Sequence, residues 1–88
     1  MSDDWGTATW RYHQVALNAA SPRDEFEAMP PVRVRARIVW AQDGPTGCDG
    51  TATRRGADGA IFVEINDRRS QTVGVWLHPD DVWWPGKR

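Results

Sequence analysis

Hydrophobic and polar residues alternate most clearly in the middle of the chain. Every second position from residue 32 to residue 40 is apolar, and arginines occupy three of the positions between them; the apolar set is Val32, Val34, Ala36, Ile38 and Trp40. A period of two is typical of a β-strand with one face toward the core. We therefore expect a strand with one apolar face and one cationic face.

Four further short strands are expected after this one. Gly56–Gly59 has the composition of a hairpin turn, and Pro79–Asp81 that of a single tight turn. Residues 41–50 are rich in Gly and Pro and predict a long first loop. The expected strands are Thr51–Arg54, Ala60–Ile65, Thr72–Leu77 and Val82–Trp84.

The first 31 residues have a different pattern. Ser21 is followed by Pro22 and then by acidic residues, which is typical of a helix N-terminus. A short helix is therefore expected to end before Pro30, with Phe26 and Met29 facing the core. Residues 7–20 fit helical spacing better than strand alternation, and residues 1–6 are expected to be frayed and partly disordered.

The chain is accordingly expected to have two parts. Residues 1–31 form an N-terminal helical arm, and residues 32–88 form a mainly β domain, with the boundary at Pro30-Pro31. Strand rhythm over residues 32–84 resembles the small five-stranded antiparallel barrel of Tudor, KOW and related adaptor domains. The resemblance rests on Gly50–Arg54, Ala60–Ile65 and Val75–Val82. It implies a small β-barrel that binds peptides or nucleic acids and seldom catalyses.

Composition narrows the class of protein. The 88 residues carry a net charge of −1, and 26% of them are charged, as expected for a single compact domain. The single cysteine, Cys48, excludes an intrachain disulfide and a cysteine-based zinc framework, which favours a reducing, cytoplasmic setting. The acidic start is unlike a secretory signal, and no apolar run is long enough for a membrane helix. Ten arginines against one lysine indicate a GC-rich bacterial genome or selection for binding.

The arginines of the first strand are candidates for nucleic-acid binding. Alternate residues on a strand lie about 6.7 Å apart, which is close to the spacing of phosphates along one nucleic-acid strand. A solvated face whose arginines pair with Glu64 or Asp67 is the alternative. The acidic N-terminal third and a pI near 6 argue against strong non-specific binding of nucleic acid. The candidate residues are Arg33, Arg35 and Arg37, extended by Arg54 and Arg55.

Six tryptophans are too many for a chain of this size to bury completely. Trp76 alternates with Val75 and Leu77, and Trp83 and Trp84 are adjacent on one strand, so these side chains should point to opposite faces. At least two tryptophans are therefore expected to be partly exposed, where they mark an interface. Alternatively, the N-terminal arm covers them. The candidate partner-binding residues are Trp76, Trp83, Trp84 and the neighbouring His78.

No motif of a catalytic or metal site is present in the sequence. His78 has only His13 as a second histidine, and Cys48 has no recognisable partner that would activate it. Neither a cofactor nor a metal is expected. The sequence thus favours a non-enzymatic module that binds another protein or a second copy of itself through exposed Trp and Arg. Nucleic-acid binding along the arginine-lined strand face is the alternative, and no membrane partner is expected.

Overall fold

The computed structural model describes residues 13–70 and 72–86. Five strands and one 3-10 turn follow one another along the chain: β1 (Phe26–Trp40), β2 (Gly44–Gly56), β3 (Ile61–Ile65), β4 (Gly74–Leu77), η1 (Pro79–Asp81) and β5 (Val82–Trp83). All strand pairings are antiparallel, and the order in the sheet is β4-β3-β2-β1-β5. The prediction of a mainly β protein is confirmed.

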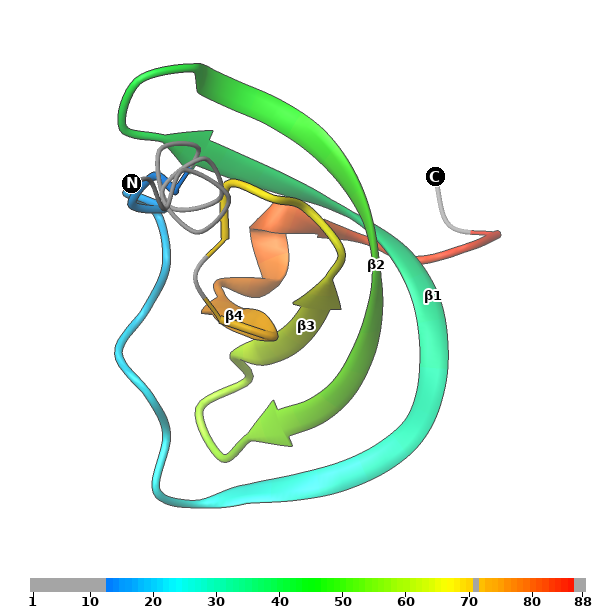
Figure 1. Cartoon of the computed structure of the whole chain (residues 1–88). Helices are drawn as coiled ribbons and strands as arrows, with labels where there is room; N and C mark the ends of the chain where they lie inside the picture. Colours follow the sequence, from blue (N-terminus) through cyan, green and yellow to red (C-terminus); the bar gives the residue numbers. More distant parts are fainter. Residues whose placement is uncertain (1–12, 71, 87–88) are drawn as a thin grey trace, which may run out of the picture.

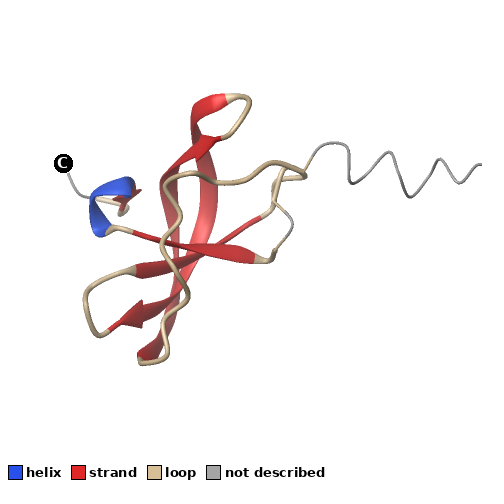
Figure 2. Cartoon of the chain, turned by 90° about the vertical axis from the view of Figure 1, so that its left-hand side faces the viewer, coloured by secondary structure: helices blue, strands red, loops and turns tan. Residues whose placement is uncertain are grey.

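A long curved hairpin of β1 and β2 dominates the molecule. In Figure 1 the two strands bend around β3, β4 and η1, while residues 13–25 run along the opposite side. The hairpin turns at residues 41–43, directly before Gly44, whose φ of 78° favours glycine. Figure 2 shows how strongly the strands cross within this single sheet. The curvature lets one sheet enclose much of its own core.

The core lies on the concave face of the hairpin. The alternating apolar residues of β1 are buried from Val34 onward. Trp40 has the largest fully buried side chain among the described residues. Ile61, Val63 and Leu77 come from β3 and β4, and Val82 comes from β5. The alternation of the sequence therefore identified the buried face of β1 correctly, and the arginines lie on the opposite, exposed face.

The predicted N-terminal helical arm is wrong for the residues that the structure describes. Residues 13–25 contain no helix, and Phe26–Met29 belong to β1. Phe26 is in register with Gly56, and the Arg23 guanidinium pairs with the Asp58 carboxylate at 2.8 Å. These long-range contacts override the local preference of Ser21-Pro22 for a helix start. Residues 1–12, which include part of the expected helix over 7–20, lie outside the described residues.

The domain boundary and the first loop also differ from the prediction. Pro30-Pro31 lies inside β1, at a register shift between Ala28 and Val32, because proline has no N–H to give to the ladder. Most of the expected loop at 41–50 is strand, with Gly44–Gly50 paired to β1. The hairpin at Gly56–Gly59 and the turn at Pro79–Asp81 are confirmed.

The predicted closed barrel is not formed. Among the described strands, β4 and β5 stand at the two ends of the sheet and do not pair with each other. Two isolated bridges, Ala16 with Trp40 and Ala20 with Trp76, attach the N-terminal segment to β1 and β4. The segment thus crosses the open side of the sheet without completing a ladder. In the described part of the chain, no helix is long and apolar enough to cross a membrane.

Candidate functional site

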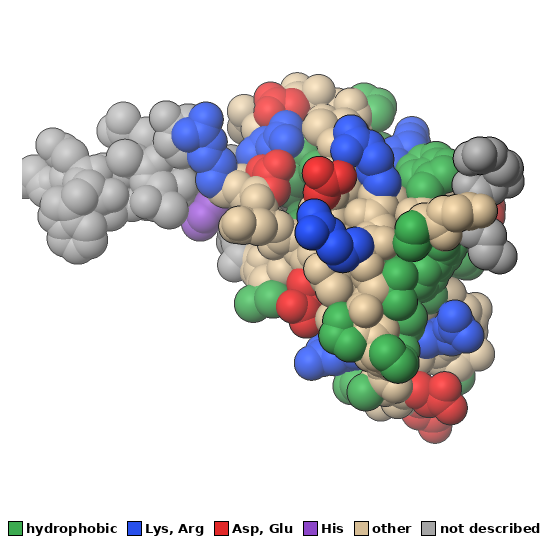
Figure 3. Space-filling model, turned by 90° about the vertical axis from the view of Figure 1, so that its right-hand side faces the viewer, with side chains coloured by type: hydrophobic (Ala, Val, Ile, Leu, Met, Phe, Trp, Pro, Cys, Tyr) green, Lys and Arg blue, Asp and Glu red, His purple; other side chains and the backbone are tan. Residues whose placement is uncertain are grey.

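One exposed face combines the arginines of β1 with a tryptophan of β5. Arg35 and Trp83 are directly paired across the two strands, so their side chains lie on the same face of the sheet. Arg33 and Arg37 lie two residues to either side of Arg35 and share that face. We call these four residues, Arg33, Arg35, Arg37 and Trp83, the Arg–Trp face. Figure 3 shows this side of the molecule, where basic and acidic side chains lie beside a band of hydrophobic ones.

Trp83 is the exposed aromatic at the centre of this face. It is 53% exposed, whereas its neighbour Val82 is buried in the core. An open groove of about 480 Å³ lies on one side of it, and a second groove of about 310 Å³ lies on the other. The first groove is lined by Arg35, Arg37, Pro45, Thr46, Gly47 and Trp83, and the second by Arg33, Val34, Arg35, Asp49, Trp83, Trp84 and Pro85.

Two of the three arginines are held by carboxylates. Arg35 Nη1 donates to Asp49 Oδ1 at 2.9 Å, across the hairpin, and Arg37 Nη1 donates to Asp81 Oδ1 at 3.3 Å. Arg33 forms no ion pair with any residue that the structure describes. The expected partners, Glu64 and Asp67, are not used by these arginines. Such exposed pairs contribute little to stability, but they orient the guanidinium groups.

Gly47 makes room for one of these guanidinium groups. A Cβ at this position would stand 2.9 Å from Arg35 Nη2, and the Gly47 carbonyl accepts a long hydrogen bond of 3.5 Å from the same nitrogen. The Arg35 guanidinium therefore leans over β2 at Gly47, although 60% of its side chain stays exposed. It forms part of the wall of the first groove beside Trp83.

No protein-family model, curated protein or solved structure matches this chain. What the Arg–Trp face does must therefore be argued from its own geometry.

The predicted exposure of Trp76 is wrong. Trp76 is 6% exposed, and its ring lies 5.3 Å from that of Phe62 and 5.8 Å from that of Phe26. The N-terminal segment covers it, as the alternative interpretation held, but as an extended chain: the Ala20 N–H donates to the Trp76 carbonyl at 2.8 Å. Trp84 is half-buried and packs against the core.

The remaining candidates lie apart from the two grooves. His78 is exposed, and its Nδ1 accepts a hydrogen bond of 3.1 Å from the Asp80 N–H, so it caps η1. The Arg54 guanidinium packs over the rings of Phe26 and Phe62 at 5.2 and 4.9 Å. Arg55 is exposed and pairs in register with Glu27. The structure therefore does not join Arg54 and Arg55 to the arginines of β1 in one groove.

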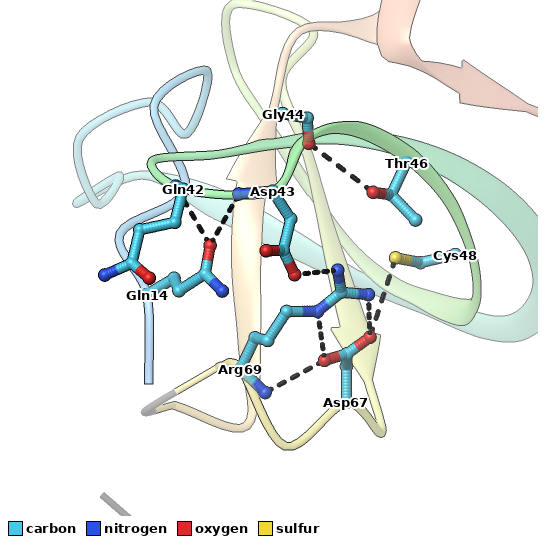
Figure 4. A network of polar contacts seen from close by, with 8 residues as sticks. All are labelled: Gln14, Gln42, Asp43, Gly44, Thr46, Cys48, Asp67 and Arg69. Carbon is cyan, nitrogen blue, oxygen red and sulfur yellow. Dashed lines mark hydrogen bonds and ion pairs between the residues drawn. The ribbon is translucent and has the colours of Figure 1, made fainter. Parts of the chain in front are cut away.

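A polar network lies at another edge of the molecule (Figure 4). Arg69 donates to both carboxylate oxygens of Asp67 at 2.8 and 2.9 Å and to Asp43 at 3.0 Å, and its guanidinium packs 4.9 Å from the centre of the Trp40 ring. These hydrogen bonds hold the pKa of Asp67 below its usual value and raise the pKa of Arg69. The network ties the β1–β2 turn to the segment after β3.

The buried Cys48 lies beside this network. Its Sγ is 4.0 Å from Asp67 Oδ2. Burial, and secondarily the Asp67 charge, raise the pKa of the thiol, which keeps it protonated and unreactive. Among the described residues, no group of three or more His, Cys, Asp or Glu side chains could hold a metal ion. The network is therefore best explained as a structural tie.

Sequence reasoning identified Arg33, Arg35, Arg37 and Trp83 separately but did not join them. The arginine row was the candidate for nucleic acid and Trp83 a candidate for a protein partner, although the favoured module was expected to bind through exposed Trp and Arg. Their proximity depends on the pairing of β5 with β1, which joins Arg35 to Trp83, 48 residues later in the sequence. No pattern of neighbouring residues in the sequence predicts this pairing.

Proposed function

We propose that this chain is a non-enzymatic binding module that contacts another protein, or a second copy of itself, through the Arg–Trp face. Trp and Arg are the residue types that contribute most to binding energy at protein interfaces. Here an exposed Trp83 stands directly across from Arg35, with a groove on each side. This juxtaposition is the observation that carries the proposal.

The ion pairs of Arg35 and Arg37 also support a role of this face in binding. An exposed arginine loses much side-chain entropy when a partner immobilises it. Arg35 and Arg37 are already oriented by Asp49 and Asp81, and Gly47 leaves space for the Arg35 guanidinium. Because these side chains are already partly ordered, less side-chain entropy is lost when a partner binds.

The likeness to small barrels of the Tudor and KOW adaptor type remains a proposal. It rests on strand rhythm, and the open sheet would represent an incompletely closed relative of such barrels. Adaptor domains of this kind bind peptides or nucleic acids, which agrees with a role in binding rather than catalysis.

Nucleic-acid binding along β1 is the second candidate. The spacing of Arg33, Arg35 and Arg37 favours it, and an exposed Trp83 could stack on a base. The carboxylates of Asp49 and Asp81 within the same face oppose it, as does the net charge of −1.

The test combines light scattering with affinity capture. Full-length chain is measured by size-exclusion chromatography with light scattering over a range of concentrations, and immobilised chain is used to capture partners from its source cells. Trp83→Ala should weaken whichever association is found by about 2–4 kcal/mol. Val73→Ala is the matched control, because Val73 is also exposed and apolar, at 70%, and lies away from the two grooves. Association that is unaffected by Trp83→Ala would refute the proposal.

A further inference from the structure

The two grooves beside Trp83 differ in chemical character. The first is walled by the Trp83 ring, Pro45 and Thr46, with the two arginines Arg35 and Arg37 at its side. It is an open groove of about 480 Å³ with a mainly apolar lining. Such a groove suits an apolar side chain. The second groove is smaller, and its lining includes Arg33 together with the Arg35–Asp49 ion pair.

The charges of the Arg–Trp face indicate which charged group the ligand should carry. Asp49 and Asp81 each neutralise one arginine of the face. Arg33 has no carboxylate partner among the described residues and leaves one positive charge uncompensated. A ligand that offers one carboxylate at this position would complete the pairing, because a guanidinium group binds a carboxylate with two parallel hydrogen bonds.

A regular polyanion fits this arrangement less well. Phosphates that follow the arginines along β1 would approach the Asp49 carboxylate, which lies directly across from Arg35. Asp80 adds a carboxylate that is 89% exposed next to Asp81. A peptide with a single carboxylate at Arg33 meets less of this repulsion, because it places no charge beside Asp81 and because Asp49 is already paired with Arg35.

We propose that the Arg–Trp face binds an extended acidic peptide. One apolar side chain of the peptide occupies the groove between Trp83 and Pro45, the peptide crosses Trp83, and a carboxylate about three residues away pairs with Arg33. The first groove lies beside Arg35 and Arg37, so about three residues of an extended peptide, or about 10 Å, would reach along β1 to Arg33. This inference rests on the proposed function and adds the chemistry of the partner.

The experiment is a selection from a random heptapeptide display library on immobilised full-length chain. Enriched peptides are expected to contain Asp or Glu about three residues from an aromatic residue, Leu or Pro. Fluorescence anisotropy of labelled enriched peptides then gives dissociation constants. Trp83→Ala should weaken binding about 30-fold or more, and Arg33→Glu about 10-fold or more.

Two variants serve as controls. Arg55→Glu makes the same charge change at another exposed arginine, which lines a different pocket with Glu25 and Glu27, and Val73→Ala removes an exposed apolar side chain far from the grooves. Both should leave the dissociation constants within about twofold of the unaltered chain. Circular dichroism of every variant verifies that it folds.

The outcomes separate the inference from the proposed function. Peptides that require Trp83 but carry no acidic residue would overturn the inference and leave the proposed function standing. No enrichment, or enrichment that survives Trp83→Ala, would overturn both. A labelled oligo-dT or oligo-U probe that binds more tightly than any peptide, and loses affinity with Arg33→Glu and Arg55→Glu alike, would replace the peptide by a single-stranded nucleic acid.

Discussion

Removal of the Trp76 indole is expected to be among the most costly single changes in this protein. Trp76 is 6% exposed and contacts the rings of Phe26 and Phe62. Replacement of a buried Trp by Ala costs about 3–5 kcal/mol, from lost transfer energy and the cavity left behind. A chain of 88 residues has a total stability of about 4–13 kcal/mol. Trp76→Ala therefore removes a large fraction of the stability.

Phe26, at the start of β1, should account for part of this effect. Phe26 is 45% exposed, so Phe26→Ala alone should cost about 1–2 kcal/mol. Because the two rings are 5.8 Å apart and tilted by 55°, their coupling in a double-mutant cycle should be about 0.5–1.5 kcal/mol. A coupling of this size would show that the Phe26 ring packs against Trp76 in solution.

The assay is urea unfolding followed by far-ultraviolet circular dichroism, because tryptophan fluorescence changes with the substitution itself. The four chains of the cycle are the unaltered protein, Phe26→Ala, Trp76→Ala and the double variant. Trp83→Ala is the matched control and should change the unfolding free energy by less than about 0.5 kcal/mol. Additivity of Phe26→Ala and Trp76→Ala within about 0.3 kcal/mol would refute the contact.

Three further predictions concern stability and the thiol. Gly74→Ala should destabilise the chain by about 2 kcal/mol or more in urea unfolding, because the added Cβ would overlap the Val63 carbonyl oxygen of the neighbouring strand. Asp67→Asn should cost about 1 kcal/mol at neutral pH, by loss of the charged hydrogen bonds from Arg69. The folded-state pKa of Asp67 is lowered, so its contribution is present above the unfolded pKa and is lost as the pH falls through the folded value. The difference from the unaltered chain should therefore shrink as the pH falls below the ordinary aspartate pKa, and a constant difference would contradict this cause. Cys48 is buried with a raised pKa, so it should react with a disulfide reagent about 100-fold or more slowly in the folded chain than in urea, and equal rates would contradict the burial.

From Val32 onward the alternation of apolar residues predicted the strands of the sheet, except for Gly44–Gly50, which had been expected as a loop. A period of two fixes which side chains face the core, so the buried side of β1 and the exposed arginines could be assigned before any coordinate was known. The turns at Gly56–Gly59 and Pro79–Asp81 were equally predictable, because their residue types restrict the backbone locally. These features depend on neighbouring residues only.

Features that depend on distant contacts were mispredicted. Ser21-Pro22 has a genuine preference for a helix start, but the backbone of Phe26–Ala28 pairs with β2, and Phe26 packs on Trp76. Gly44–Gly50 is poor in strand-forming residues and is held extended by its register with β1. Tertiary pairing outweighed local propensity in both segments.

Trp83 and Trp84 are adjacent, but we expect Trp83 to contribute to binding and Trp84 to contribute to stability. Successive side chains of an extended chain point to opposite faces, and here Trp84 packs against the core while Trp83 is 53% exposed between the two grooves. Trp84→Ala should therefore lower the unfolding free energy by about 1–3 kcal/mol and alter binding less, whereas Trp83→Ala should weaken binding about 30-fold or more at nearly unchanged stability. Urea unfolding and anisotropy titrations on both variants measure the two effects side by side. If Trp83→Ala proved the more destabilising change, Trp83 would belong to the framework of the sheet, and its exposure would no longer indicate a binding surface.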